Sequence, residues 1–215
     1  MLKHKYAEDA LVEAGIDEAG RGCLWGPLMA AAVIWPSSVS ESDMSLAAQI
    51  KDSKLLSPKK RQILEAFIKR VAIWSTGSVT AKEIDDLGMT RSNRLAFQRA
   101  VDGLAVAPDR LLIDGILPLD SGREEIVEPK ADGTYLAVAA ASILAKEARD
   151  TLIRTACAAD ATLETNYSIL SSKGYGTAAH RTGIQTHGML DDHRRLFLRK
   201  LLGHDHRPGG IDFLD

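Results

Sequence analysis

Residues 12–35 read VEAGIDEAGRGCLWGPLMAAAVIW and contain the clearest strand patterns of the chain. It contains two short apolar runs, Val12–Asp17 and Leu28–Trp35, each bounded by glycine or proline. Such runs are typical of buried β-strands. The glycine-rich residues 18–27 join them. The stretch therefore predicts two buried strands connected by a loop with an accessible backbone.

Strand and helix patterns alternate through the first 150 residues. Ser57-Pro58 supplies an N-cap and a first-turn proline for one helix, and the capping box Thr80–Glu83 opens a second helix that continues to Val101. Further strands are predicted at 71–79, 110–114 and 126–127, and an alanine-rich buried helix at 136–146. Helical patterns dominate from residue 151, and residues 204–215 resemble a loose tail. We predict an α/β core over residues 1–150 and a C-terminal helical extension over 151–215 that contributes to substrate binding.

Length and composition exclude several classes of protein. A chain of 215 residues suits one globular domain with a small appendage. Its 45% apolar and 26% charged residues exclude a disordered or collagen-like chain. The longest apolar run has eight residues, against the ~20 that a membrane span needs. With no apolar leader at the N-terminus, we expect a cytoplasmic protein without membrane contact.

Cysteine and histidine spacing argues against a zinc site. Cys23 and Cys157 are expected to be reduced thiols, and no CxxC pair occurs. The spacing of His180, His187 and His193 does not match zinc-binding signatures. We expect neither zinc nor an organic cofactor.

Acidic residues stand at the ends of the predicted elements. Asp17 ends the first strand and Glu18 follows it, while Asp114 ends the strand at 110–114. Asp132 lies just before the apolar helix, where it would cap that helix and also face the strand ends. Strand ends in one sheet meet at one edge, which is the usual position of an α/β site. Each acid taken alone also fits a turn or a helix cap.

Four carboxylates at one edge would repel one another, and a divalent cation would remove that penalty. An oxygen-only ligand set suits Mg²⁺ or Mn²⁺. Such clusters hold two ions about 3.5–4 Å apart and serve phosphoryl transfer. The spacing leaves both readings open, a two-metal site and a set of separate capping residues.

Two further patches fit a polyanionic substrate. Gly20-Arg21-Gly22 follows the acidic pair directly, and its backbone can approach a sugar hydroxyl or a phosphate closely, although it also fits a simple turn. Residues 173–207 carry seven Lys or Arg against three acids, which suits phosphate binding or a solvated helix face. Tyr175, between two glycines, is either a stacking residue for a sugar or base or a packed side chain.

Together these segments resemble the ribonuclease HII family, the type 2 ribonucleases H, over residues 12–197. The matching blocks, in order, are Gly15–Gly22, Asp52–Lys54, Glu83–Asp85, Leu112–Gly115, Ala139–Lys146, Lys173–Thr177 and the His180, Gly188, His193, Arg194 series. Departures occur at Cys23 and Trp25, where the family usually has proline and a small residue, and at Ala131, Tyr135, Ala137 and Leu196. None of these departures replaces a carboxylate, so they bear on substrate positioning more than on the type of reaction.

The resemblance implies an RNase H-like three-layer α/β/α fold with a mixed five-stranded sheet. It implies hydrolysis of RNA in RNA–DNA hybrids and incision 5′ of single ribonucleotides in duplex DNA, by two Mg²⁺ or Mn²⁺ ions, giving 5′-phosphate and 3′-hydroxyl ends. The residues that match the family's functional positions are Asp17, Glu18, Asp114 and Asp132 for metal, Gly20, Arg21 and Gly22 for the ribose 2′-hydroxyl, Tyr175 for sugar stacking, and Lys54 and Lys173 for phosphates.

Rival functions make different demands on the sequence. A related nuclease that cuts DNA alone shares the acids, and an assay with a single ribonucleotide separates the two. A phosphoacceptor receiver domain has its second aspartate a few dozen residues after the first, whereas Asp17 and Asp114 are 97 residues apart. A catalytically inactive hybrid binder would not need all four acids. We expect a monomer whose Ile211-Asp-Phe-Leu214 segment is a candidate contact for a sliding clamp.

Overall fold

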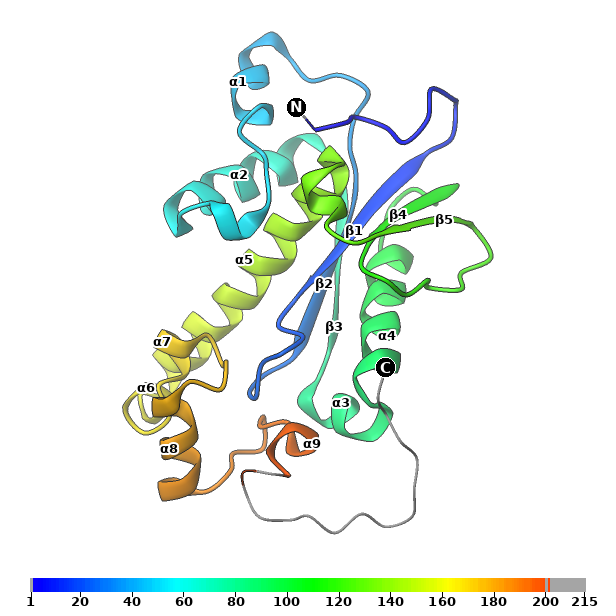
Figure 1. The fold of residues 1–215 in the computed structure, drawn as a ribbon. Coiled ribbons are helices and arrows are strands. Elements are labelled where there is room, and N and C mark those ends of the chain that lie inside the picture. The colour runs from blue at the N-terminus through cyan, green and yellow to red at the C-terminus, as the bar shows by residue number, and fades with distance from the viewer. Residues whose placement is uncertain (1, 200, 202–215) are drawn as a thin grey trace.

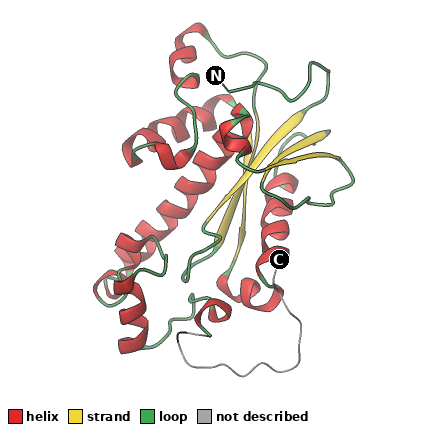
Figure 2. Cartoon of the chain, in the orientation of Figure 1, coloured by secondary structure: helices red, strands yellow, loops and turns green. Residues whose placement is uncertain are grey.

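The computed structural model describes residues 2–199 and residue 201. Five strands form one mixed sheet in the order β3-β2-β1-β4-β5 (Figures 1 and 2). Strands β1, β2 and β3 pair antiparallel, whereas β4 and β5 run parallel to β1. The strands are β1 (Glu13–Ala19), β2 (Leu28–Ile34), β3 (Ile73–Val79), β4 (Arg110–Asp114) and β5 (Glu124–Glu128). The predicted mixed five-stranded sheet is confirmed.

Helices cover both faces of the sheet (Figure 1). Ala31 and Val33 of β2 pack with α2 (Pro58–Val71) and α5 (Leu136–Ala159). The alternate residues Ala30 and Ala32 pack with α3 (Ala81–Leu87) and α4 (Met89–Asp102) on the other face. This alternation buries both sides of the strand, so the three-layer α/β/α fold is confirmed.

The short elements around these layers lie in connecting segments. They are η1 (Glu41–Asp43), α1 (Met44–Ala47), η2 (Ser53–Leu55), η3 (Ala131–Gly133), α6 (Thr162–Thr165), α7 (Ile169–Ser172), α8 (Ala178–His187) and α9 (Arg195–Leu198). A third apolar cluster packs Trp25 of the glycine-rich loop against Ile153, Ile184 and Leu198. The C-terminal part is therefore helical, as predicted, and has its own small core. The predicted tail at 204–215 lies outside the described residues.

Two predicted helices have different boundaries in the structure. The capping box at Thr80 forms, but the helix ends at Leu87 and a second one begins at Met89. Gly88 between them has φ 77°, a conformation that interrupts a helix and favours glycine. The apolar helix continues beyond residue 146 to Ala159, because Ile153 and Cys157 pack into the third cluster. The predicted boundary at residue 150 thus falls inside one continuous helix.

Two sequence-level expectations concern redox state and membranes. Cys23 and Cys157 are both buried and free. Among the residues described, no helix combines the length and the apolar character that crossing a membrane requires.

Candidate active site

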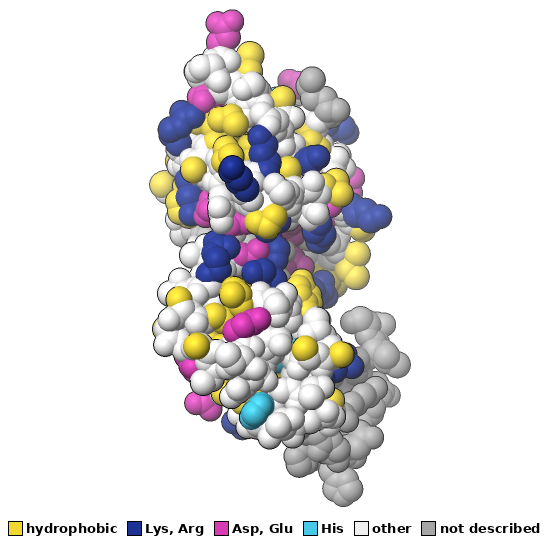
Figure 3. Space-filling model, turned by 90° about the vertical axis from the view of Figure 1, so that its left-hand side faces the viewer, with side chains coloured by type: hydrophobic (Ala, Val, Ile, Leu, Met, Phe, Trp, Pro, Cys, Tyr) yellow, Lys and Arg dark blue, Asp and Glu magenta, His cyan; other side chains and the backbone are white. Residues whose placement is uncertain are grey.

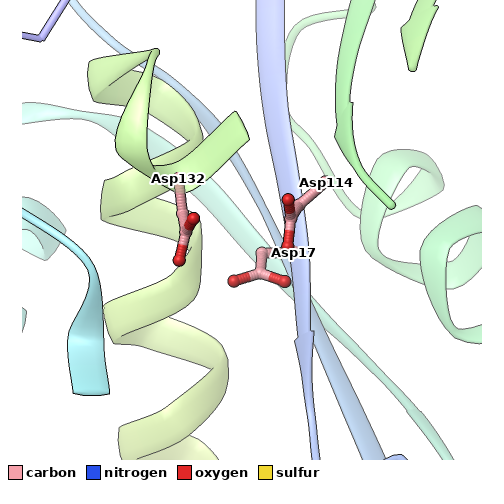
Figure 4. A group of neighbouring side chains, drawn as sticks. All are labelled: Asp17, Asp114 and Asp132. Atoms are coloured by element: carbon pink, nitrogen blue, oxygen red, sulfur yellow. The ribbon is translucent and has the colours of Figure 1, made fainter. Parts of the chain in front are cut away.

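Three aspartates converge beside the central strand (Figure 4). Strands β1 and β4 are parallel neighbours with Ile16 opposite Ile113, so Asp17 and Asp114 follow at adjacent positions. One carboxylate oxygen from each of Asp17, Asp114 and Asp132 lies within 4.8 Å of the others. Asp17 and Asp114 are 97 positions apart in sequence, and they are neighbours in the fold because parallel pairing aligns their strands.

Asp17 lies within its strand, contrary to the prediction that it ends it. Pairing with β4 stops near Ile113, but β1 continues against β2 as far as Ala19 opposite Met29. Asp17 is therefore fixed by strand pairing on one side, and its side chain is only 5% exposed. A ladder on one side gives the carboxylate a rigid base.

Asp132 does not cap the apolar helix, and that prediction was wrong. Tyr135 occupies the N-cap position of α5, whereas Asp132 lies in the 3₁₀ turn η3 before it. The N–H of Ala131 donates to Asp114 Oδ1 at 2.8 Å, which ties this turn to the end of β4. That bond holds the buried Asp132 next to Asp114.

Glu18 is not a member of the three-aspartate group. Successive residues of a strand point to opposite faces, so Glu18 faces away from Asp17. Burial raises the pKa of Glu18 to about 7; Arg21 opposes this, Asp114 adds to it, and a hydrogen bond with Asn93 of α4 lowers it. A metal-binding role for Glu18 stays a prediction. Asn93, which the sequence analysis did not single out, is a buried polar residue on an apolar helix face.

The cluster stores electrostatic repulsion. Burial raises the pKa of Asp17 well above its ordinary value, and the charges of Glu18 and Asp114 raise it further. Burial likewise raises the pKa of Asp132, followed by repulsion from Asp114 and Asp52. A divalent cation at these oxygens would relieve both effects. An all-oxygen donor set of this charge fits Mg²⁺ or Mn²⁺.

Two serines and a lysine surround the cluster. The hydroxyls of Ser53 and Ser142 are 2.9 Å apart, and Ser142 lowers the pKa of Asp17 by hydrogen bonding. Burial opposes the charge of Lys54, but attraction by Asp52, Asp17 and the other two aspartates raises its pKa overall. Lys54 therefore lies close enough to feel the whole cluster. The serines were missed because an isolated serine in an apolar helix carries no distinctive signal.

The predicted glycine loop lies against a buried arginine. Gly20 has φ 94°, and a side chain there would come within 2.5 Å of Arg149 Nε. Arg194 Nη1 donates to the carbonyls of Gly20 at 2.7 Å and Arg21 at 3.0 Å. No atom lies within 4 Å of where a side chain on Gly22 would begin. Hydrogen bonds from Arg194 thus fix the loop, and its backbone is open to a ligand at Gly22.

Tyr175 lies beside the same loop. It forms a β-bridge with Cys23, and Leu24 N–H donates to Gly174 O at 2.8 Å. The Tyr175 side chain is 46% exposed. Burial, and then its contact with the Cys23 thiol, raise its pKa. The structure therefore brings the predicted sugar-reading loop and the predicted stacking tyrosine together.

The C-terminal basic segment is divided between exposed and buried side chains among the described residues. His180, His193 and Arg194 are buried, and only part of the predicted strip faces solvent, including Arg181 and Arg195. Their polar atoms bond to backbone carbonyls and to each other, so they act inside the protein.

Lys173 is the predicted basic residue close to Tyr175 in the sequence. The charge of Lys173 acts on the thiol of Cys157, whose pKa burial raises and Lys173 lowers. The carbonyl of Lys173 accepts hydrogen bonds from Arg149 Nη2 at 3.3 Å and from Cys23 Sγ at 3.5 Å, so Lys173 lies beside the glycine loop. Its phosphate contact stays a prediction. Lys200, Arg207 and the candidate clamp segment 211–214 lie outside the described side chains. Figure 3 shows a hollow across the middle of one face, where Lys and Arg side chains flank acidic ones.

A mixed sheet with carboxylates on two adjacent parallel strands and helices on both faces is the arrangement expected of an RNase H-like, metal-dependent nuclease. The family model for Ribonuclease HII matches residues 14–200. The chain therefore belongs to the ribonuclease HII family, whose members are metal-dependent endoribonucleases with RNase H activity on RNA–DNA hybrids.

Individual relatives agree with this membership. Ribonuclease HII from Parabacteroides distasonis is 44% identical over 197 residues, which cover 89% of this chain and 92% of that protein. Ribonuclease H2 from Pyrococcus horikoshii OT3 superposes with a TM-score of 0.71 at 27% identity, covering 89% of this chain and 97% of that one. The RNase HII in the PCNA:RNase HII complex from Archaeoglobus fulgidus superposes with a TM-score of 0.69 at 26% identity, over 86% of this chain and 94% of that one.

Proposed function

We propose that this member of the ribonuclease HII family cuts RNA–DNA hybrids and also incises 5′ of single ribonucleotides in duplex DNA, leaving 5′-phosphate and 3′-hydroxyl ends. The observation that carries the proposal is the position of the three aspartates beside a loop with an open glycine. The loop begins at Gly20, three residues after Asp17, so the loop that would read the sugar lies next to a residue that would hold metal.

Asp17, Asp114 and Asp132 are the residues that would hold Mg²⁺ or Mn²⁺, with Glu18 as a further candidate ligand. When bound there, two divalent ions would supply an activated water and charge stabilisation for the leaving oxygen. Lys54 adds positive charge beside the carboxylates and would neutralise a phosphate of the substrate strand.

Recognition of the ribonucleotide falls to the loop and the tyrosine. The ribose 2′-hydroxyl both donates and accepts a hydrogen bond, and it distinguishes RNA from DNA. The backbone of Gly20-Arg21-Gly22 can approach it because Gly22 is open, and the half-exposed Tyr175 would stack on the neighbouring sugar. Binding of the ribose 2′-hydroxyl by the loop would then also position the adjacent phosphate at the aspartates.

Cleavage of matched duplexes tests the proposal. One duplex carries a single ribonucleotide, a second is all DNA, and a third is a continuous hybrid, each with Mg²⁺ or Mn²⁺ and with the cut mapped. We expect a single cut 5′ of the ribonucleotide and none in the all-DNA duplex. Cleavage of the all-DNA duplex would indicate a DNA nuclease instead, and cleavage of the hybrid alone would remove the single-ribonucleotide activity.

Two further proposals concern partners and location. The Archaeoglobus fulgidus RNase HII has been solved with PCNA, and this supports a sliding-clamp contact through residues 211–214. A chain truncated after residue 203 should lose clamp binding and keep cleavage of free duplexes. The free cysteines support work in the reducing cytoplasm, which cell fractionation tests. The protein is also proposed to be a monomer, which light scattering tests.

A further inference from the structure

Two histidines outside the carboxylate cluster form a buried pair. His180 of α8 is 0% exposed and His193 is 1% exposed. Their Nε2 atoms are 3.0 Å apart. A hydrogen bond between two imidazole nitrogens needs one donor and one acceptor, so the tautomer of one ring determines that of the other.

The outer nitrogens determine the direction of this bond. The N–H of Leu190 donates to His193 Nδ1 at 2.8 Å, so in a neutral ring the His193 proton lies on Nε2. His193 Nε2–H therefore donates to His180 Nε2. His180 then carries its proton on Nδ1 and donates to the carbonyl oxygen of Tyr175 at 2.9 Å. A single arrangement satisfies all four ring nitrogens, and it requires both rings to be neutral.

The surroundings favour neutral rings. Burial lowers the pKa of His180, and burial followed by the charge of His180 lowers the pKa of His193 to about 4. The aromatic ring of Tyr167 faces His193 with 5.6 Å between ring centroids. The neighbouring Arg194 directs its guanidinium to loop carbonyls, and the three relay bonds leave no ring nitrogen for an acidic partner.

The relay ends at the residue that the proposed function assigns to the substrate sugar. Tyr175 lies on the segment that pairs with Cys23, and His193 forms a β-bridge with Trp25 a little further along the same loop. The segment 190–194 is therefore linked to both substrate-reading parts: Arg194 donates directly to the Gly20 and Arg21 carbonyls, and His193 is linked to the Tyr175 carbonyl through His180.

We propose that His180 and His193 are positioning residues for cleavage at a ribonucleotide: their directed hydrogen-bond relay fixes Tyr175 relative to the Gly20–Gly22 loop. The inference rests on the proposed function, because it is the ribonucleotide that Tyr175 and the loop are proposed to contact. The alternative is that the pair only fills the core of the C-terminal part.

Two amide substitutions at His180 separate these readings. An asparagine amide nitrogen occupies the place of Nδ1, so His180→Asn keeps a donor for the Tyr175 carbonyl. A glutamine amide occupies the place of Nε2, so His180→Gln keeps an acceptor for His193 and loses the donor to Tyr175. We expect His180→Gln to lower kcat/KM on the single-ribonucleotide duplex about tenfold, and His180→Asn to recover most of it. His187→Gln, on the exposed part of the same helix, is the matched control and should leave kcat/KM unchanged.

A double-mutant cycle tests whether the effect passes through Tyr175. In a Tyr175→Ala background, His180→Gln should cause no further loss of kcat/KM, because the side chain that the relay positions is gone. Losses that multiply, or equal losses in His180→Asn and His180→Gln, would overturn the proposal. Wild-type cleavage of the same duplex is measured first, so that failure of the proposed function is recognised separately.

The relay is also tested without any variant. Long-range ¹H–¹⁵N NMR correlations of the full-length wild-type protein at pH 7 report the tautomer of each histidine. We expect an Nδ1–H tautomer for His180 and an Nε2–H tautomer for His193. The reverse tautomers, or a charged ring in either residue at this pH, would overturn the relay even if the variants failed to fold.

Discussion

The aspartate cluster and the buried histidine–arginine segment handle polar side chains in opposite ways. Asp17, Asp114 and Asp132 face one another as like charges that a cation would relieve. His180 and His193 have every ring nitrogen bonded inside the protein. The first region is arranged for an added ion, and the second for holding backbone in place. Carboxylates that repel one another therefore indicate a site for a cation and for chemistry. Polar side chains whose hydrogen bonds are all made inside the protein indicate a role in positioning the backbone.

The largest expected effect comes from substitutions in the aspartate cluster. Asp17→Asn or Asp114→Asn should lower single-turnover cleavage by at least about 1,000-fold, because a ligand carboxylate is removed. Asp17→Asn also removes a buried charge that neighbouring carboxylates repel, and should raise the free energy of unfolding of the metal-free protein by about 1 kcal/mol. Cleavage within tenfold of wild type in Mg²⁺ would contradict the assignment. Urea unfolding in a chelator checks the stability.

The second prediction concerns the buried arginine. Arg194→Met leaves the carbonyls of Gly20, Arg21 and Gly26 without their donor and should lower the free energy of unfolding by about 3 kcal/mol. Arg195→Gln changes the exposed neighbour and should stay within about 0.5 kcal/mol of wild type. Similar losses in both variants would mean that the burial of Arg194 has no energetic role. Denaturant unfolding in parallel measures both.

The histidine pair predicts a pH dependence of stability. The pKa of His193 is lowered in the folded state, to about 4 from an ordinary 6.5, so unfolding takes up a proton between these values. The contribution of the neutral His193 to the free energy of unfolding is therefore fully present above pH 6.5 and is lost as the pH falls toward 4. We expect this residue to contribute a loss of about 2 kcal/mol between pH 7 and pH 5. His193→Gln should flatten that part of the profile, and an unchanged slope would contradict the shift.

The smallest effect concerns the exposed tyrosine. Tyr175→Ala should lower kcat/KM at a single ribonucleotide about tenfold, since one stacking contact is lost. The Tyr175→Ala variant should bind Mn²⁺ with wild-type affinity, because Tyr175 is not one of the three clustered aspartates. Loss of Mn²⁺ binding in this variant would show that the loop and the cluster cannot be separated as the comparison requires.

Much of the fold and the cluster was predictable from local patterns. Apolar runs ending in acids placed Asp17 and Asp114 on strands, and parallel pairing then aligned them. The break at Gly88 was missed because a capping box shows where a helix begins and carries no information about where it ends. The 3₁₀ turn at Asp132 was missed because an acid before an apolar helix has the same pattern as an N-cap.

The burial of His180, His193 and Arg194 was not predictable in the same way. A count of basic residues in a segment reports net charge, whereas burial depends on which loops return to bond with them. These three side chains bond to backbone atoms of Leu190, Tyr175 and the glycine loop. Every residue has such backbone atoms, so residue types alone do not show which ones will be partners.

Titration with Mn²⁺ followed by electron paramagnetic resonance tests whether Asp17, Asp114 and Asp132 bind metal, because it reports binding without requiring turnover. We predict saturable binding to the wild-type protein that Mg²⁺ displaces, and strongly weakened binding to Asp114→Asn. Equal Mn²⁺ binding by both proteins would contradict the claim that these three carboxylates form the metal site.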